Sequence, residues 1–312
     1  MDDRDAIESH RLTFGLVAGA GNSRASMDEL ASSGFDSLWV GGHVASPNPV
    51  PEVITSLVRL AAQTEGVRIG TAVLVLPLYQ PGVLAKQLAE VDRMSGGRLT
   101  VGIGAGGEYE EEFRLCGIPR SERFTRTDEA MILLRELWSG HRVSYSGMHH
   151  PMTDVRIDPP PAQPGGPPLV VGGRRRNAMR RAAVLGDGWL PYLYSAERYH
   201  DSVDQITLIA REAGRSLDGF QWHAFVFVNV NRDRETARDE VVEFLGGTYH
   251  QDFSQFIDRV AVAGDPHQVG QRLQAYVDAG ARSLIFVPAS RTDPLAVRRS
   301  LATEVLPGLA TR

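Results

Sequence analysis

Segments typical of β-strands alternate with segments typical of helices along almost the whole chain, and this alternation restricts the possible folds more than any other feature. Short apolar runs rich in β-branched residues are each followed by a segment whose apolar residues recur at helical spacing. Eight such units favour a closed (β/α)8 barrel, the TIM barrel of the α/β class, because an open doubly wound sheet needs fewer units. The eight expected strands are 12–18, 37–40, 67–76, 99–103, 168–171, 188–191, 222–230 and 283–287.

The expected helices follow these strands in the same order. A serine cap opens the first of them, and a proline stands near the first turn of the third. The expected helical segments are 26–33, 51–63, 81–94, 121–138, 177–185, 196–213, a region ending near 257, 266–279 and 294–306.

Residues 140–168 interrupt this alternation between the fourth and fifth expected strands. The stretch is rich in Pro, Gly and His and has neither a helical nor a long strand period. We interpret it as an insertion within one barrel domain that spans residues 1–312, since barrels of this length usually form one domain. The short loop 43–51 after the second strand leaves two alternatives for the mouth of the barrel: the mouth is open, or the insertion covers it.

Charge and cysteine content exclude several classes of function. The formal net charge of −5 gives no sign of nucleic-acid binding. Cys116 is the only cysteine, so the chain has neither a disulfide framework nor a cysteine metal cluster. His149 and His150 are adjacent and lack the i, i+4 spacing of a helical metal site, so we interpret them as solvated loop residues and predict no metal. The chain begins with acidic residues and has no apolar run of about 18 residues, which predicts a soluble, cytoplasmic protein.

A glycine-rich turn, Gly102–Gly107, joins the fourth strand to an acidic, helix-like segment. Glycines at such a point let a flat or anionic ligand approach the backbone amides, because no Cβ is in the way. The letters fit G-x-G-x-x-G, but the dinucleotide motif normally opens a domain and needs an acidic residue at a strand end about 20 residues later. Neither condition is met in this sequence, so we predict a cofactor site of another kind.

Gly172 and Gly173 are followed by three arginines, Arg174–Arg176, at the start of an expected helix. Positive side chains oppose the positive end of a helix dipole, so this arrangement costs free energy unless an anion is bound there. Glycine amides at a helix N-terminus form a phosphate cradle. The residues themselves leave two interpretations open, a phosphate site or solvated arginines on a loop.

Several groups of residues resemble the luciferase-like flavin and deazaflavin oxidoreductases. They are FDSLWVGGH at 35–43, RIGTAVL at 68–74 with LPL at 76–78, SGGR at 95–98, and VVGG at 170–173 followed by GDGW at 186–189. The similarity runs in the expected order from about Leu12 to the C-terminus. It is closest to the branch that depends on coenzyme F420, in which the second strand ends in aromatic-x-Gly-x-His, whereas other members of the family use FMN.

The resemblance implies roles for particular residues. His43 either lies over the redox face of the ring and moves the proton that accompanies a hydride, or caps its loop by hydrogen bonding. Glu108 is either a second acid near the ring or one of several charges that favour the start of a helix. Thr71, Ala72 and Val73 are implied behind the middle ring, with a non-proline cis peptide between Ala72 and Val73. The other implied cofactor residues are Gly104, Ala105 and Gly106 along the ring and ribityl chain, and Gly172, Gly173, Arg174 and Arg175 at the phosphate.

From the resemblance we expect an oxidoreductase that transfers a hydride between coenzyme F420 and an unidentified small organic substrate at the C-terminal face of the barrel. The arginines favour the phosphate and oligoglutamyl tail of F420 over FMN. Two alternatives stay open: an FMN-dependent monooxygenase supplied with reduced flavin by a separate reductase, and a cofactor-free structural or binding homologue. We also expect a homodimer that binds neither nucleic acid nor a membrane.

Overall fold

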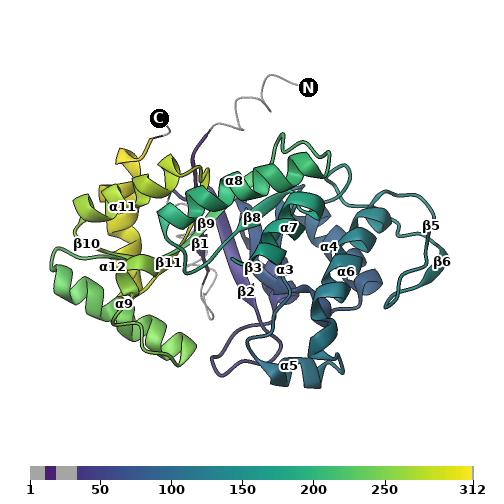
Figure 1. Ribbon diagram of the computed structural model, residues 1–312, viewed down its shortest axis with the longest axis horizontal. Helices are drawn as coiled ribbons and strands as arrows, with labels where there is room; N and C mark the ends of the chain where they lie inside the picture. Colours follow the sequence, from purple (N-terminus) through teal and green to yellow (C-terminus); the bar gives the residue numbers. More distant parts are fainter. Residues whose placement is uncertain (1–10, 19–33, 311–312) are drawn as a thin grey trace.

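Eight parallel strands close into a barrel in the computed structural model, which describes residues 11–18 and 34–310 (Figure 1). Each strand pairs with the next barrel strand along the chain, and the last pairs with the first. The predicted (β/α)8 barrel is therefore confirmed. Its strands are β1 (Thr13–Val17), β2 (Ser37–Gly42), β3 (Arg68–Val75), β4 (Leu99–Gly104), β7 (Leu169–Gly172), β8 (Gly188–Leu190), β9 (Gln221–Val230) and β11 (Ser283–Pro288).

Helices surround the barrel and cover the outer face of its strands (Figure 1). The expected helix 26–33 lies outside the described residues. The expected helix 294–306 is shorter than predicted, because a π-helical turn, Leu301–Val305, follows its first seven residues. No helix of the described ranges is long and apolar enough to cross a membrane. The helices are α3 (Val53–Gln63), α4 (Pro81–Met94), α5 (Glu110–Leu115), α6 (Arg123–Trp138), α7 (Arg176–Leu185), α8 (Ala196–Glu212), α9 (Arg234–Tyr249), α10 (Ile257–Val260), α11 (Pro266–Asp278) and α12 (Pro294–Ser300).

A further strand, β10 (Ala261–Gly264), was not predicted from the sequence. It pairs in parallel with the last residues of β9, which extends beyond the point where β8 ends. An isolated bridge between Tyr192 and Phe225 marks the end of pairing on the β8 side. The four residues of β10 are too few to show a period, so the strand depends on the free edge that β9 offers there.

The barrel interior is filled around Trp39 of β2, which is 2% exposed. A Cβ atom at Gly15 or Gly70 would lie 2.6 Å from an atom of the Trp39 indole, so these two strands can carry only glycine beside it. Trp39 packs in one cluster with Val170 and Ile285. The larger cluster of buried side chains lies between the strands and the surrounding helices.

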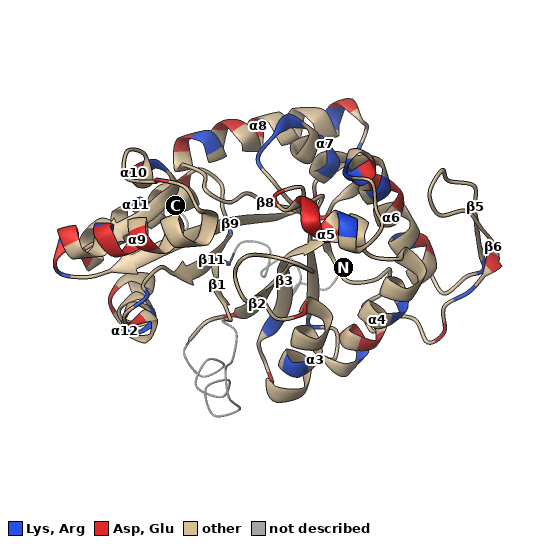
Figure 2. Cartoon of the chain, turned by 90° about the horizontal axis from the view of Figure 1, so that it is seen from below, with Lys and Arg blue, Asp and Glu red and all other residues tan. Residues whose placement is uncertain are grey.

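The insertion 140–168 contains a short antiparallel pair, β5 (Val143–Tyr145) and β6 (Met152–Val155). Figures 1 and 2 show this pair at the side of the molecule, separated from the barrel by α6. The alternative in which the insertion covers the mouth of the barrel is therefore wrong. The physical reason is that the insertion leaves the end of α6 and packs back along the outer side of that helix.

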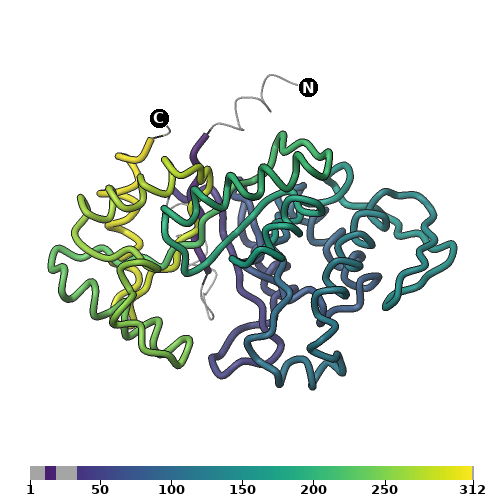
Figure 3. The backbone as a smooth tube through the Cα atoms, viewed as in Figure 1, coloured from purple at the N-terminus to yellow at the C-terminus, as the bar shows by residue number. Residues whose placement is uncertain are grey.

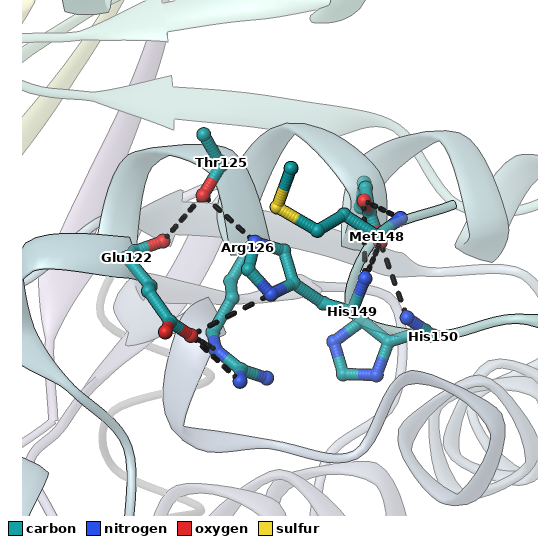
Figure 4. Close-up of polar contacts among 7 residues, drawn as sticks. Glu122, Thr125, Arg126, Met148, His149 and His150 are labelled. Atoms are coloured by element: carbon teal, nitrogen blue, oxygen red, sulfur yellow. Dashed lines mark hydrogen bonds and ion pairs between the residues drawn. The ribbon is translucent and has the colours of Figure 1, made fainter.

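The interpretation of His149 as a solvated loop residue is also wrong. Its side chain is 6% exposed and lies between Thr125 and Glu122 at the start of α6, with Nε2 2.9 Å from Thr125 Oγ1 (Figure 4). The carboxylate of Glu129 accepts hydrogen bonds from the backbone N–H groups of residues 148, 149 and 150. These contacts fasten the insertion to α6, which gives the two histidines a structural explanation.

Candidate functional site

The residues predicted to bind a cofactor lie together at the C-terminal ends of four neighbouring strands. The ends of β2, β3, β4 and β7 are adjacent in the sheet, and each contributes one of the predicted groups. Figure 2 views the barrel from this end. The residues that the sequence places on separate segments therefore share one side of the mouth, as a site in a barrel requires.

The end of β3 leaves the regular sheet. The peptide bond between Ala72 and Val73 is cis, at the position that the resemblance implied. The register of β3 shifts against both β2 and β4 there. Thr71 is fully buried and its hydroxyl donates to the carbonyl of Gly102 at 2.6 Å, so Thr71 supports this bulge from behind. Ala72 and Val73 are half-buried at the mouth.

Two of the predicted glycines make room for Val73. A Cβ atom at Gly104 would lie 2.7 Å from Val73 Cγ2, and one at Gly172 would lie 2.8 Å from Val73 Cγ1. The valine side chain therefore fills the space that both glycines leave free. The sequence predicted that these glycines clear space for a ligand. In the structure, the side chain of Val73 fills the space beside Gly104 and Gly172 and forms the floor of the site.

His43 is held by a carboxylate that the sequence analysis did not select. His43 Nδ1 lies 3.2 Å from Oε2 of Glu112 in α5, and the backbone N–H of Val44 donates to the same oxygen at 3.3 Å. The Glu112 side chain is 0% exposed, while that of His43 is 27% exposed. Among the residues that the structure describes, Oε1 of Glu112 is buried without a hydrogen-bond partner. The ring of Tyr109 packs edge-on against the imidazole, with centroids 4.9 Å apart.

An ionised carboxylate can only accept hydrogen bonds, so Glu112 selects the tautomer of His43 that carries its proton on Nδ1. The other nitrogen, Nε2, is then the acceptor that a ligand at the mouth can meet. Glu112 was missed because it belongs to a run of acidic residues, Glu110–Glu112, that favours the start of any helix. Phe113, buried beside it, was the only signal that this face of α5 points inward.

Loops from distant parts of the chain are joined around the mouth. Asn48, in the loop after β2, donates to the carbonyl of Thr248 at the end of α9 at 2.8 Å. Figure 3 shows these two segments side by side. Tyr192 donates to Glu108 at 2.6 Å and stacks on Tyr249 with ring centroids 6.5 Å apart. The mouth is therefore bordered by the β2, β4 and β8 loops and by α9.

The carboxylate of Glu108 thus already accepts a hydrogen bond from the phenol of Tyr192. Burial and the neighbouring Glu108 raise the pKa of Tyr192, so the phenol remains a hydrogen-bond donor to the carboxylate. Trp189 and Tyr194, two other aromatic residues near the sixth strand, are buried in the main core and do not face the mouth. Of the aromatic residues near the sixth strand, Tyr192 is the one that borders the mouth.

The arginines after β7 lie at the start of α7, as predicted. Arg174 donates to the carbonyl of Leu193 at 3.2 Å, and its guanidinium lies 5.2 Å from the centre of the Tyr192 ring. Arg175 is the N-cap residue of α7 and provides no side-chain cap. Within the described ranges, no carboxylate forms an ion pair with any of Arg174–Arg176. Also within these ranges, no group of three or more His, Cys, Asp or Glu side chains could hold a metal ion.

The chain is similar along most of its length to proteins of known activity. It is 28% identical, over 89% of its length and 90% of the relative's, to an F420-dependent glucose-6-phosphate dehydrogenase of Microbacterium testaceum. A solved F420-dependent secondary alcohol dehydrogenase in complex with an F420–acetone adduct covers 96% of this chain and 99% of that structure, with a TM-score of 0.85 and 18% identity.

A second solved structure shares the fold but contains a different cofactor. The oxygenating constituent of 3,6-diketocamphane monooxygenase from Pseudomonas putida, in complex with FMN, has a TM-score of 0.75 and 19% identity, with coverage of 96% and 99%. Identity this low supports the fold alone. The model of the family described as luciferase-like monooxygenase matches residues 17–283. This chain therefore belongs to the luciferase-like family.

Proposed function

We propose that this protein is an oxidoreductase that uses coenzyme F420 to transfer a hydride to or from a small organic substrate. The observation that carries the proposal is the start of α7, where three consecutive arginines have no acidic partner among the described residues and the helix has no side-chain cap. A helix end of this kind has open backbone donors and concentrated positive charge, which an anion would stabilise. The similarity to F420-dependent dehydrogenases supports the same cofactor.

The residues present fit such a cofactor. The bulge at Ala72 and Val73 offers a half-buried apolar floor on which a flat ring can lie, close to the imidazole of His43. Gly172 and Gly173 lead from this floor to the arginines, which suit a phosphate that carries further carboxylates. When bound, F420 supplies a carbon centre that accepts or donates a hydride. FMN has no anionic tail for the arginines to meet.

His43 is the residue that we assign to proton transfer. Oxidation of an alcohol removes a hydride from carbon and a proton from oxygen, and reduction of a carbonyl reverses both. With its Nδ1 proton held by Glu112, the imidazole can receive the substrate proton on Nε2 or return it from there. We assign no proton transfer to Glu108, because its carboxylate already accepts a hydrogen bond from Tyr192.

The test compares F420 and FMN as ligands of the purified protein. We expect quenching of F420 fluorescence at micromolar protein and little binding of FMN. Reduction of F420 is then followed with propan-2-ol and with glucose 6-phosphate, the substrate types named for the relatives. Tight FMN binding without F420 binding would instead support the FMN-dependent monooxygenase with its separate reductase, and binding of neither would support a cofactor-free homologue. Gel filtration of the same sample tests the expected homodimer.

A further inference from the structure

One half of the barrel mouth lies opposite the predicted cofactor site, and the proposed function leaves its role open. The strands β8, β9, β11 and β1 are adjacent in the sheet and form this half, across the barrel from β2, β3, β4 and β7 (Figure 2). A substrate that meets a ring lying on Ala72 and Val73 faces this half of the mouth. Its side chains therefore determine which kind of substrate fits.

Half-buried apolar side chains line this half of the barrel interior. Val17 of β1 and Phe225 of β9 pack against the inner cluster around Trp39. The two floor residues of the cofactor site pack against the same cluster, so floor and opposite side are continuous. Val287 of β11 is also half-buried and points to the same face of its strand as Ile285 of that cluster. We call Val17, Phe225 and Val287 the apolar wall.

Phe225 is the largest side chain of the apolar wall, and its exposed part faces the mouth. On one side its strand pairs with β11, where Phe225 is level with the fully buried Ile285. On the other side a bridge joins it to Tyr192, beyond the end of β8. Because the ring packs into the barrel interior between two neighbours and is still half-buried, the mouth is where it remains open to a ligand.

Other aromatic rings hold Phe225 in this position from behind. Its ring lies edge-on to the buried ring of Phe227, with centroids 5.4 Å apart. Phe227 in turn contacts Tyr249 of α9, which stacks on Tyr192. All four rings pack in one cluster between β9 and α9. The apolar wall is therefore fixed by packing and offers a surface that suits carbon atoms.

The polar side chains of the neighbouring loop are already bonded to one another. The amide of Asn229 donates to Glu240 and to the carbonyl of Ala289. Thr292 donates to the other oxygen of Glu240 at 2.6 Å, and the hydroxyl of Ser290 accepts from two backbone N–H groups of its own loop. A sugar needs a partner for each hydroxyl group that it buries, because a buried hydroxyl without one costs free energy. This loop is therefore poorly suited to a polyol.

The charges near the apolar wall are also unfavourable for a phosphate. The only lysine of the chain, Lys86, lies in α4 and donates to a backbone carbonyl of the insertion. In the loop after β11, the guanidinium of Arg291 fills the space beside Gly247 of α9 that a Cβ atom would need. The rim carries the carboxylate of Glu108, which accepts from Tyr192 and repels an anion.

We propose that the substrate is an uncharged alcohol, or the corresponding ketone, with an apolar group of ring size that lies against the apolar wall. This inference rests on the proposed function and names its substrate class. In the oxidation, the carbinol carbon gives a hydride to the cofactor, its oxygen gives a proton to Nε2 of His43, and the alcohol becomes a ketone. The apolar group displaces water from the wall, which favours binding in proportion to the area covered.

The experiment measures kcat/KM for reduction of F420 with propan-2-ol, cyclohexanol and glucose 6-phosphate. Binding of cyclohexanone is measured by calorimetry with oxidised F420 present, since these two cannot react with each other. The variants are Phe225→Leu and Val287→Thr, with Arg291→Gln for the phosphate. Phe220→Leu is the matched control, because Phe220 is also half-buried, contacts Trp222 at 4.6 Å between centroids, and precedes β9 at the opposite end of the barrel.

We expect the wild type to use cyclohexanol about tenfold more efficiently than propan-2-ol, the scale of added methylene groups in an apolar site. Glucose 6-phosphate should be used at least about 10²-fold less efficiently than cyclohexanol, because its charge and hydroxyl groups find few partners. Phe225→Leu and Val287→Thr should each lower the ratio of cyclohexanol to propan-2-ol severalfold, and this ratio cancels any loss common to both alcohols. Phe225→Leu should weaken binding of cyclohexanone similarly, and Phe220→Leu should change neither value.

Equal efficiency with both alcohols would overturn the inference, and so would F420 binding without turnover of cyclohexanol. A ratio that stays constant in both wall variants would also overturn it. Efficient use of glucose 6-phosphate that is lost in Arg291→Gln would make the substrate an anion. Wild-type protein that does not quench F420 fluorescence would instead refute the proposed function, so the two failures are distinguishable. Thermal unfolding is measured in parallel; if Phe225→Leu unfolds, Val287→Thr, which keeps nearly the same shape, decides the test.

Discussion

Replacement of Glu112 by glutamine should leave the protein as stable as the wild type or make it more stable, even though Glu112 is fully buried and hydrogen-bonded. The wild-type carboxylate is 0% exposed and contacts a histidine that is itself 27% exposed, and one of its oxygens has no donor within residues 11–18 and 34–310. Transferring an ion into the interior costs several kcal/mol even after relaxation. The amide keeps an acceptor for His43 and Val44 without that cost.

The opposing contribution is the amide NH2 group of the glutamine. It would occupy the place of Oε1, which has no partner in the described part of the chain, and an unsatisfied buried donor costs about 1–3 kcal/mol. The two contributions are similar in size, so we expect the free energy of unfolding to stay constant or to rise by up to about 2 kcal/mol. For a chain of this length, that rise corresponds to an increase in Tm of about 4 °C.

The assay is chemical denaturation followed by circular dichroism, with Glu111→Gln as the matched control. Glu111 lies in the same turn of α5 with its side chain 80% exposed, so its replacement should change stability by less than about 0.5 kcal/mol. In the F420 assay, Glu112→Gln should slow turnover by about tenfold or more, because an amide no longer selects one tautomer of His43. A loss of stability above about 2 kcal/mol would refute the reasoning and make Glu112 a structural residue.

Four further changes test other parts of the site and barrel. His43→Ala should lower turnover by about 10²-fold with unchanged F420 affinity, whereas unchanged turnover would leave His43 a loop cap. Arg174→Ala/Arg175→Ala should weaken F420 binding more at low than at high salt without destabilising the apoprotein; equal binding across the salt range would contradict this. Gly102→Ala should destabilise by about 1–3 kcal/mol in denaturation experiments, because a methyl group there overlaps a backbone carbonyl, and wild-type stability would disprove it. Burial lowers the pKa of His223 to about 3, so below about pH 6.5 this histidine is protonated in the unfolded chain and neutral in the folded chain. The free energy of unfolding should therefore fall by about 1.4 kcal/mol for each pH unit below 6.5, and His223→Gln should remove this dependence.

The barrel could be predicted from the sequence because its signal is repeated. An error of one or two residues at the end of a strand, such as ending the second at Val40 instead of Gly42, does not change the count of units. The unfavourable position of Arg174–Arg176 could also be predicted from the sequence, because the repulsion between these charges and the helix dipole depends only on consecutive residues. The cis peptide at Ala72 was located by similarity to a family and not by any local pattern.

The contacts that complete the site depend on the tertiary structure. Glu110, Glu111 and Glu112 are identical in sequence terms, and only the packing of α5 against the loop after β2 decides that the third is buried under His43. The same limit applies to Phe225, which reads as one apolar residue of a strand. Its position at the mouth follows from the way β9 continues beyond the end of β8.

The two glycines after β7 bear on how the cofactor site that we propose would bind an anion. The absent side chain of Gly172 makes room for Val73, and the N–H of Gly173 donates to the carbonyl of Leu190 at 3.2 Å, with a φ of +124° that favours glycine. These backbone groups therefore build the floor of the site and are not free to cradle a phosphate as the sequence pattern suggested. In the function that we propose, the first turn of α7 and the guanidinium groups of its arginines would therefore have to bind the anion. Binding that depends on side-chain charge is screened by salt and grows with the charge of the ligand, whereas binding by a backbone cradle alone would depend less on either. The salt dependence of F420 affinity thus distinguishes binding by arginine side chains from binding by a backbone cradle, and we expect the stronger salt dependence that side-chain charges give.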